Sequence, residues 1–276
     1  MVKVDSFAPL PGSDLYYSLL YGVTKAQRDQ LAVINALKSE LCTIPVSVSD
    51  LGVARAKLEW WRLEAERTAA CVPRHQLTQT YFEKYGADGQ INEALHFLIQ
   101  GLSEEIDGHD IVNREQQLNW FDSTFEPLYK LQRAILHDND NVKVENHRYL
   151  GRWIEVGYSL LNLKPLAAHG LRRLPSESLR AAGCSWEDVS TGNARVELGK
   201  LIASECNLVI NGISKIVTHT PTKVRRTQQP LLALAAIVQN TLIELKKDGD
   251  RVWQQRVELT PFRKLWLAWR IRYFRR

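Results

Sequence analysis

The amino-acid sequence predicts an all-α protein that forms a single domain. Apolar residues recur three and four positions apart along most of the 276 residues, and the sustained alternation typical of strands is hard to find. Hydrophobic residues make up 45% of the chain, which is enough to fill a substantial core. No long Gly/Ser-rich or Pro-rich linker divides the sequence. We therefore expect one helical domain over residues 1–276.

Several segments carry this helical periodicity clearly. Between residues 51 and 67 one apolar stripe faces charged residues on the other positions, and Asp50, directly before it, has the side chain of a helix N-cap. The stripe consists of Leu51, Ala54, Leu58, Trp61 and Ala65. The same spacing predicts further helices over Asn92 to Ile106, Trp120 to Leu136, Val196 to Val217 and Leu231 to Leu245.

Metal and nucleotide motifs are missing from the sequence. Cys42, Cys71, Cys184 and Cys206 form no CxxC pair, which is typical of scattered small apolar residues in a reducing compartment. The seven histidines show no metal-ligand spacing, and no GxGxxG, Walker A or GxSxG string occurs. We therefore expect no resident cofactor.

The sequence also lacks the segments that direct a chain into or across a membrane. Its first residues include Asp5 and no apolar stretch like that of a signal peptide. The longest apolar run, Leu231 to Val238, is too short to span a bilayer. These observations favour a cytoplasmic protein.

Positive charge is concentrated near the C-terminus. Residues 221–276 hold thirteen Lys or Arg against four acids, a net charge of +9, so the rest of the chain carries −4 of the overall +5. The segment 261–276 interleaves cations with aromatic residues, as helices that lie on anionic membranes do. We predict a membrane-surface helix formed by Arg263, Lys264, Trp266, Trp269, Arg270, Arg272 and Phe274.

The composition of this segment allows two other interpretations. A terminal helix that packs its aromatic residues on the domain and exposes its arginines would have the same composition. A nucleic-acid role is less favoured, because the charge lies in one tail and no known binding module accompanies it. We therefore expect an anionic membrane surface as a partner, and no nucleic acid.

Two segments carry a family resemblance. Val33 to Arg67 contains the element Trp60-Trp61-Arg62, and Gly151 to Gly183 contains Gly157, Leu160, Asn162, Arg172, Arg173, Leu174 and Pro175. These segments resemble the two catalytic helices of the squalene/phytoene synthase family. The resemblance implies an isoprenoid synthase-like helical bundle. Enzymes of that family join two prenyl diphosphates head to head, and Mg²⁺ ions held by D-x-x-x-D motifs bind the diphosphates.

The carboxylates of those motifs are missing here. Leu166 and Gly170 stand where the resemblance places the two aspartates of the second motif, and Pro165 is expected to bend or end that helix. In the first segment only Glu40 is acidic between Leu31 and Ser49. Because Mg²⁺ prefers carboxylate oxygens beside phosphate oxygens, these changes predict a lost metal site.

Short patterns narrow the resemblance to a divergent branch of the family. They include Ala32, Leu37, Glu40 and Leu41 before the Trp60 element, His169 and Gly170 before Arg172, and the string Leu-Trp-x-x-Trp-Arg near the C-terminus. The chain is similar in these patterns to the branch that includes the mitochondrial complex I assembly factor of phytoene-synthase-like sequence. Members of that branch look like prenyl synthase folds without the Asp-rich sites.

The resemblance implies seven ligand-binding candidates. Leu58 and Trp61 would wall a prenyl-chain cavity, and Tyr17 would face the diphosphates. Arg172 and Arg173 would bind a phosphate, because a guanidinium group can donate two parallel hydrogen bonds to phosphate oxygens. The full set is Tyr17, Glu40, Leu58, Trp61, Asn162, Arg172 and Arg173. The other interpretation makes the aromatic residues plain core and the arginines a solvated pair.

Two functions follow from these patterns. The favoured one is a non-catalytic family member that binds a prenyl lipid or a protein partner, with a peripheral place on a membrane. The alternative is an active prenyltransferase acting on farnesyl or geranylgeranyl diphosphate, with Mg²⁺ ligands relocated to Glu40 and Asp50, or to Glu104, Glu105 and Asp107. The first is favoured because a site without metals forfeits several kcal/mol of leaving-group stabilisation.

Overall fold

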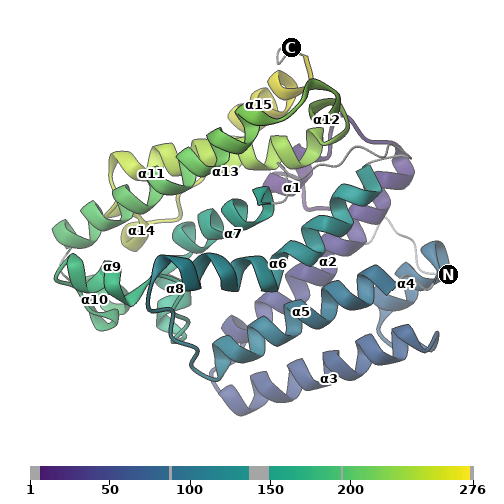
Figure 1. Ribbon diagram of the computed structural model, residues 1–276, viewed down its shortest axis with the longest axis horizontal. Helices are drawn as coiled ribbons and strands as arrows, with labels where there is room; N and C mark the ends of the chain where they lie inside the picture. Colours follow the sequence, from purple (N-terminus) through teal and green to yellow (C-terminus); the bar gives the residue numbers. More distant parts are fainter. Residues whose placement is uncertain (1–6, 87–88, 137–148, 194, 274–276) are drawn as a thin grey trace.

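Helices form the regular structure of the part of the chain that the computed structural model describes, residues 7–86, 89–136, 149–193 and 195–273, and no strand occurs there (Figure 1). The fold is therefore all-α, as predicted. The helices are α1 (Asp14–Ser18), α2 (Lys25–Ser47), α3 (Leu51–Ala69), α4 (Gln76–Tyr85), α5 (Gly89–Ile106), α6 (Arg114–Leu136), α7 (Leu150–Leu161), α8 (Leu163–Ala168), α9 (Ser176–Ala181), α10 (Trp186–Thr191), α11 (Arg195–His219), α12 (Thr222–Thr227), α13 (Gln229–Lys247), α14 (Arg251–Gln254) and α15 (Pro261–Tyr273).

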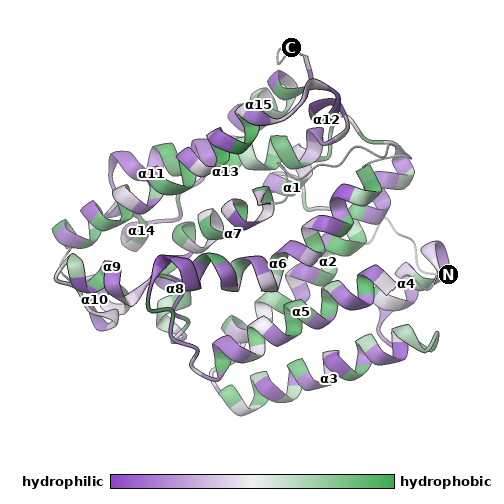
Figure 2. Cartoon of the chain, viewed as in Figure 1, coloured by the Kyte–Doolittle hydropathy of each residue, from purple (hydrophilic) through white to green (hydrophobic). Residues whose placement is uncertain are grey.

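Each helix predicted from periodicity is present, and its ends lie within a few residues of those expected, except that α6 begins six residues earlier. Asp50 caps α3 as predicted, since its Oδ1 accepts a hydrogen bond of 2.7 Å from the Gly52 amide. The helices are amphipathic, and hydrophobic and hydrophilic residues alternate along most of them in Figure 2.

The helices pack in a continuous series across the molecule. α5 lies between α3 and α6, and α6 packs on α7 (Figure 1). The central helix α7 also contacts α11 and α13, and α13 in turn contacts α1 and α15. Residues from both ends of the chain therefore meet on α13.

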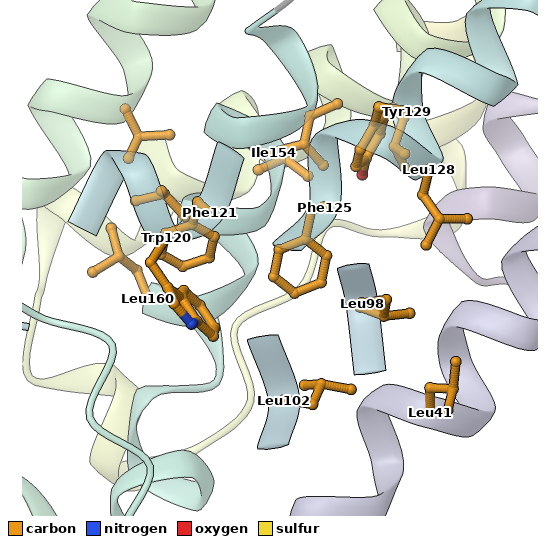
Figure 3. Packing of buried hydrophobic residues seen from close by; sticks show 14 of the residues in the cluster. Leu41, Leu98, Leu102, Trp120, Phe121, Phe125, Leu128, Tyr129, Ile154 and Leu160 are labelled. Carbon is orange, nitrogen blue, oxygen red and sulfur yellow. The ribbon is translucent and has the colours of Figure 1, made fainter. Parts of the chain in front are cut away.

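One large hydrophobic cluster runs through this series and includes side chains from α2 to α15. Figure 3 shows part of it, in which Phe125 of α6 lies between Leu98 of α5 on one side and Trp120 and Phe121 on the other. The rings of Phe121 and Phe125 stack with their centroids 5.8 Å apart. A continuous core of this kind is what a single domain requires.

Two glycines permit the close approach of α6 to its neighbours. A Cβ on Gly101 of α5 would lie 2.0 Å from the Thr124 hydroxyl oxygen, and one on Gly151 of α7 would lie 2.3 Å from the Tyr129 ring. No larger residue fits at either place without moving α6. These contacts hold α5, α6 and α7 against the centre of the bundle.

The helix that carries the second family motif is interrupted, as the proline predicts. α7 ends at Leu161 and α8 begins at Leu163, so Pro165 lies in the first turn of a short second helix, where its missing amide removes no helical hydrogen bond. The chain then leaves α8 at Gly170, whose φ of +76° is left-handed.

Candidate functional site

The positions of the missing second motif lie on this short helix and the turn after it. Leu166 is buried in α8, and Gly170 forms the turn. The amides of Gly170 and Leu171 bond to the carbonyls of Ala167 and Leu166, which completes the end of the helix. This segment therefore supplies packing and a turn, and no carboxylate.

Arg173, three residues beyond that turn, points into the protein interior. Its Nε and Nη2 donate to the two carboxylate oxygens of Glu105 on α5 at 2.7 and 2.8 Å, and both residues are buried. The guanidinium carbon also lies 5.5 Å from the centroid of the Trp120 ring. In this bidentate pair the Nε–Nη2 edge of Arg173 is occupied by Glu105, so that edge is not offered to a phosphate.

A second buried ion pair joins α2 to α7. Lys38 of α2 contacts the Glu155 carboxylate, which also accepts a hydrogen bond of 2.6 Å from the Tyr129 hydroxyl of α6. The Lys38 ammonium lies 5.4 Å from the centroid of the Tyr129 ring. Burial, and then the Glu155 charge, hold the pKa of Tyr129 well above its ordinary value, so this hydroxyl stays a donor.

Cys42 lies one helical turn after Lys38, within the electrostatic reach of both ion pairs. Lys38, Glu155, Arg173 and Glu105 all act on its pKa. Burial outweighs the two cations and raises the pKa of Cys42 to about 11, which leaves the thiol protonated at neutral pH. The centre of the bundle is thus a polar cluster in which each charge has an opposite partner. We call Lys38, Cys42, Glu105, Glu155 and Arg173 the buried ionic centre.

These residues do not fit a magnesium site of the family's kind. Mg²⁺ needs carboxylate oxygens that are open to it, and both carboxylates of the buried ionic centre are held by cations. Across the described ranges, no three His, Cys, Asp or Glu side chains gather in a group that could hold a metal ion.

The relocated ligands of the alternative interpretation are also engaged elsewhere. Asp50 caps α3, Glu104 accepts a hydrogen bond from Gln100, and Glu105 belongs to the buried ionic centre. Asp107 pairs with Arg55 at 2.6 Å on the surface. Glu40 lies apart from them, exposed on α2.

Glu40 and Trp61, two of the sequence-predicted ligand-binding residues, line one groove. The groove has a volume of about 770 Å³ and lies between α2, α3 and the start of α4. Trp60 and His75 add aromatic surface, with the His75 ring 4.5 Å from that of Trp61. Glu40 and Lys57 are the only charged groups among its lining residues. We call this the tryptophan groove.

The other predicted ligand-binding residues are dispersed. Leu58 is fully buried in the main core, and Tyr17 packs beside the small cluster of Ile237, Leu259 and Leu267. Asn162 is exposed and donates to the Tyr158 carbonyl, and Arg172 is exposed beyond α8. The structure therefore brings together Glu40 and Trp61 from the predicted set, and separates the rest.

The C-terminal helix α15 has two distinct faces. Leu267, Ala268 and Ile271 are buried against the domain, and Lys264 joins them. The opposite face, at helical spacing, carries exposed apolar side chains: Phe262 is 76% exposed, Trp266 46% and Tyr273 59%. We call Phe262, Leu265, Trp266, Trp269 and Tyr273 the aromatic ridge.

Lys264 therefore departs from the membrane-surface set predicted from the sequence. Only 5% exposed, it pairs with Asp14 at 2.7 Å and donates to the Gly12 carbonyl at 3.0 Å, because its position in the helix faces α1. Arg263 pairs with Glu244 at 2.8 Å beside the ridge, Arg270 is half-buried, and Arg272 is exposed. Phe274 lies outside the described residues. None of the helices, over the residues described, is long and apolar enough to cross a bilayer.

Sequence reasoning missed Lys38, Glu155 and Asp14. A signal for two of them was available, since Glu155 interrupts the apolar run of α7 between Ile154 and Val156, and Lys38 follows the core residue Leu37 directly. A charged residue at a core position of a helix indicates a buried partner. The identity of that partner is not contained in the pattern.

Comparisons with known proteins agree with this architecture. The sequence model for squalene/phytoene synthase matches residues 11–263. A dehydrosqualene synthase crystallised in complex with a ligand superposes with a TM-score of 0.73 at 13% identity, over 95% of this chain and 91% of that one. Squalene synthase HpnC from Alicyclobacillus acidocaldarius has a TM-score of 0.69 at 13% identity, over 91% and 93%.

At this identity the two structures establish the fold alone, and no curated protein matches the sequence significantly. The family match carries the assignment, because it extends from just before α1 into α15. The chain belongs to the squalene/phytoene synthase family.

Proposed function

We propose that this chain is a non-catalytic member of its family, which binds a prenyl lipid or a protein partner at a membrane surface. The observation that carries the proposal is that the two interior carboxylates, Glu105 and Glu155, are each paired with a cation. Glu105 and Glu155 are neutralised by Arg173 and Lys38, and Leu166 and Gly170 replace the motif aspartates. Charge that would otherwise attract Mg²⁺ is already compensated within the fold.

Prenyl transfer from a diphosphate requires positive charge that is free to act on the leaving group. Departure of a diphosphate builds negative charge on the leaving group, and a catalyst must stabilise that charge where it develops. The cations of the buried ionic centre are bound to carboxylates, so they have little net charge to offer. The short sequence patterns that resemble the assembly-factor branch, whose members look like prenyl synthase folds without the Asp-rich sites, are compatible with the same role.

A turnover assay tests the proposal. The purified chain, given Mg²⁺ and farnesyl or geranylgeranyl diphosphate, is expected to form no squalene or phytoene above a no-enzyme control, while an active squalene synthase in parallel confirms the assay. Product that disappears on Glu40→Ala or Asp107→Ala would establish the alternative function, an active prenyltransferase with relocated metal ligands.

The tryptophan groove is the binding site that we propose for the prenyl chain. Its lining includes aromatic and apolar side chains and two charged groups, Glu40 and Lys57, a composition that suits an isoprenoid tail. Trp60, 40% exposed, is the residue to change, because its neighbour Trp61 is buried and also supports α3. Equilibrium dialysis with farnesol is expected to show several-fold weaker binding for Trp60→Ala. Phe97→Ala, an exposed aromatic on α5 outside the groove, serves as the matched control. Equal affinity for both variants would remove the groove from the proposal.

Peripheral membrane attachment is the third part of the proposed function. The aromatic ridge supplies apolar surface, and the net charge of +9 in residues 221–276 favours anionic lipids. Neither contribution alone gives a stable anchor, and the two together hold a folded domain reversibly on a membrane.

A further inference from the structure

A basic pocket lies beside the aromatic ridge, between α12, the start of α13 and the end of α15. Its volume is about 520 Å³, and no acid is among its lining residues. They are Thr222, Arg225, Arg226, Gln229, Leu232, Ile271, Arg272 and Tyr273. The three guanidinium groups come from two helices that are far apart in the sequence and adjacent in the fold (Figure 1).

The fold fixes two of these arginines. Arg225 donates to the carbonyls of Thr220, Val217 and Thr218 at 2.8, 3.0 and 3.0 Å, so it is anchored at the end of α11. The Nη1 of Arg272 donates to the Gln229 Oε1 at 3.3 Å. Arg226 is exposed at the rim of the pocket. Positive charge is therefore held in place around a cavity. Because these side chains are already ordered, an anionic ligand loses less binding free energy to ordering them.

The pocket and the ridge share one residue, Tyr273. Tyr273 lines the pocket and ends the ridge, where its ring lies 5.7 Å from that of Trp269. Arg272 lies beside Tyr273 on the pocket side of α15. An apolar surface bordered by a cationic cavity matches the two layers of a membrane interface, in which phosphates lie just outside the acyl chains.

We infer that this pocket binds the phosphate of an anionic phospholipid headgroup when the ridge rests on a membrane. The inference rests on the peripheral membrane attachment proposed above and adds a specific site to it. Guanidinium groups donate to phosphate oxygens bidentately, and Arg226 and Arg272 are exposed and can donate to a phosphate. A free phosphate would use the same groups, but the adjacent ridge gives a lipid a second point of attachment.

Vesicle co-sedimentation of the full chain tests the assignment. Vesicles of phosphatidylcholine alone are compared with vesicles that also contain phosphatidic acid. The pocket variant is Arg226→Gln with Arg272→Gln. The control is Arg180→Gln with Lys200→Gln, which removes the same charge from exposed positions of α9 and α11, remote from α15 (Figure 1).

We expect the pocket variant to lose about tenfold or more in affinity for the anionic vesicles, and the control to lose less than about threefold, because surface charge acts within a Debye length. Thr222→Glu, which places a carboxylate at the pocket, provides a second variant that leaves both arginines intact and is expected to give a similar loss. Circular dichroism confirms that each variant is folded.

Three results would overturn the inference. Equal losses for the pocket and control variants would mean that binding follows net charge and uses no pocket. Arginine-dependent binding of inorganic phosphate in a calorimetric titration, without arginine-dependent vesicle binding, would assign the pocket to a free phosphate. Absence of vesicle binding by the unchanged chain would remove membrane attachment altogether, while the turnover assay still decides independently whether the protein is catalytic.

Discussion

The carboxylate of Glu64 on α3 accepts a hydrogen bond of 2.6 Å from the Thr78 hydroxyl on α4. The same oxygen accepts bonds of 2.7 and 2.8 Å from the amides of Arg74 and His75, which precede α4. Glu64 is completely buried. One carboxylate therefore holds the turn between α3 and α4, which forms one wall of the tryptophan groove.

Replacing Glu64 by Gln is expected to lower the free energy of unfolding by about 1–3 kcal/mol. The neutral amide oxygen is a weaker acceptor for the three buried donors, and an amide nitrogen replaces the oxygen that pairs with Arg67. Denaturant titration measures the loss. Glu59→Gln on the exposed face of the same helix is the control, and its change is expected to stay within about 0.5 kcal/mol. Equal effects of the two variants would contradict the structural role of Glu64.

The contribution of Glu64 is expected to depend on pH. Burial alone would raise its pKa, but the Thr78 hydroxyl and the two amides outweigh burial and hold the pKa below the ordinary value. Because the folded pKa is lowered, the stabilisation is present above the unfolded value of about 4.3 and is lost as the pH falls through the folded pKa. The stability difference between the unchanged chain and Glu64→Gln should therefore be constant from pH 7 to 5 and narrow below about pH 4. A difference that widens on acidification would contradict this assignment.

Arg173→Met is expected to cost about 3–5 kcal/mol, since it leaves Glu105 buried without its cation. Adding Glu105→Leu to the same chain should recover most of this loss, because a well-packed apolar pair replaces an ion pair at little cost. Urea unfolding of both single variants and the double variant completes the cycle. Additive losses would mean that the two side chains do not depend on each other.

Gly101→Ala is expected to destabilise the protein by about 1–3 kcal/mol, because the added methyl group overlaps the Thr124 side chain where α5 meets α6. Gly89→Ala is the matched control on the same helix. Its added Cβ has open space around it, so this variant should be neutral or slightly more stable. Thermal unfolding compares the two. A smaller loss at position 101 than at position 89 would contradict the close packing.

Truncation after Thr260 is expected to destabilise the domain as well as to weaken membrane binding. It removes Leu267 and Ile271 from the core and leaves Asp14 without Lys264. Point changes on the ridge, such as Trp266→Ser, should reduce vesicle binding while changing the melting temperature far less than the truncation, because that side chain is nearly half exposed and the buried face of α15 is kept. A large drop in melting temperature for Trp266→Ser would show that the ridge contributes to folding.

Local sequence patterns were sufficient to predict α3, α5, α6, α11 and α13, the Asp50 cap and the interruption near Pro165, because each depends on residues that are close in the sequence. The interior could not be predicted in the same way. Arg173 and Glu105 are 68 positions apart, and Lys38 and Glu155 are 117 apart, so no local pattern pairs them. The sequence also does not indicate where a long cationic side chain points. Lys264 was predicted at the surface with Arg263, yet one residue along a helix turns a side chain by about 100° and places it against α1.

The contact between Lys264 and the α1 region has a consequence for how the protein folds. Gly12 and Lys264 are 252 positions apart, so their contact closes nearly the whole chain into a loop. Such a closure is entropically unfavourable until the intervening helices have assembled, and long-range contacts of this kind form late. During synthesis α1 is made long before α15, so the ion pair between Asp14 and Lys264 can form only after α15 has been made. Until α15 has been made, the part of the α13 surface that α15 covers remains exposed, and apolar surface exposed during folding promotes self-association.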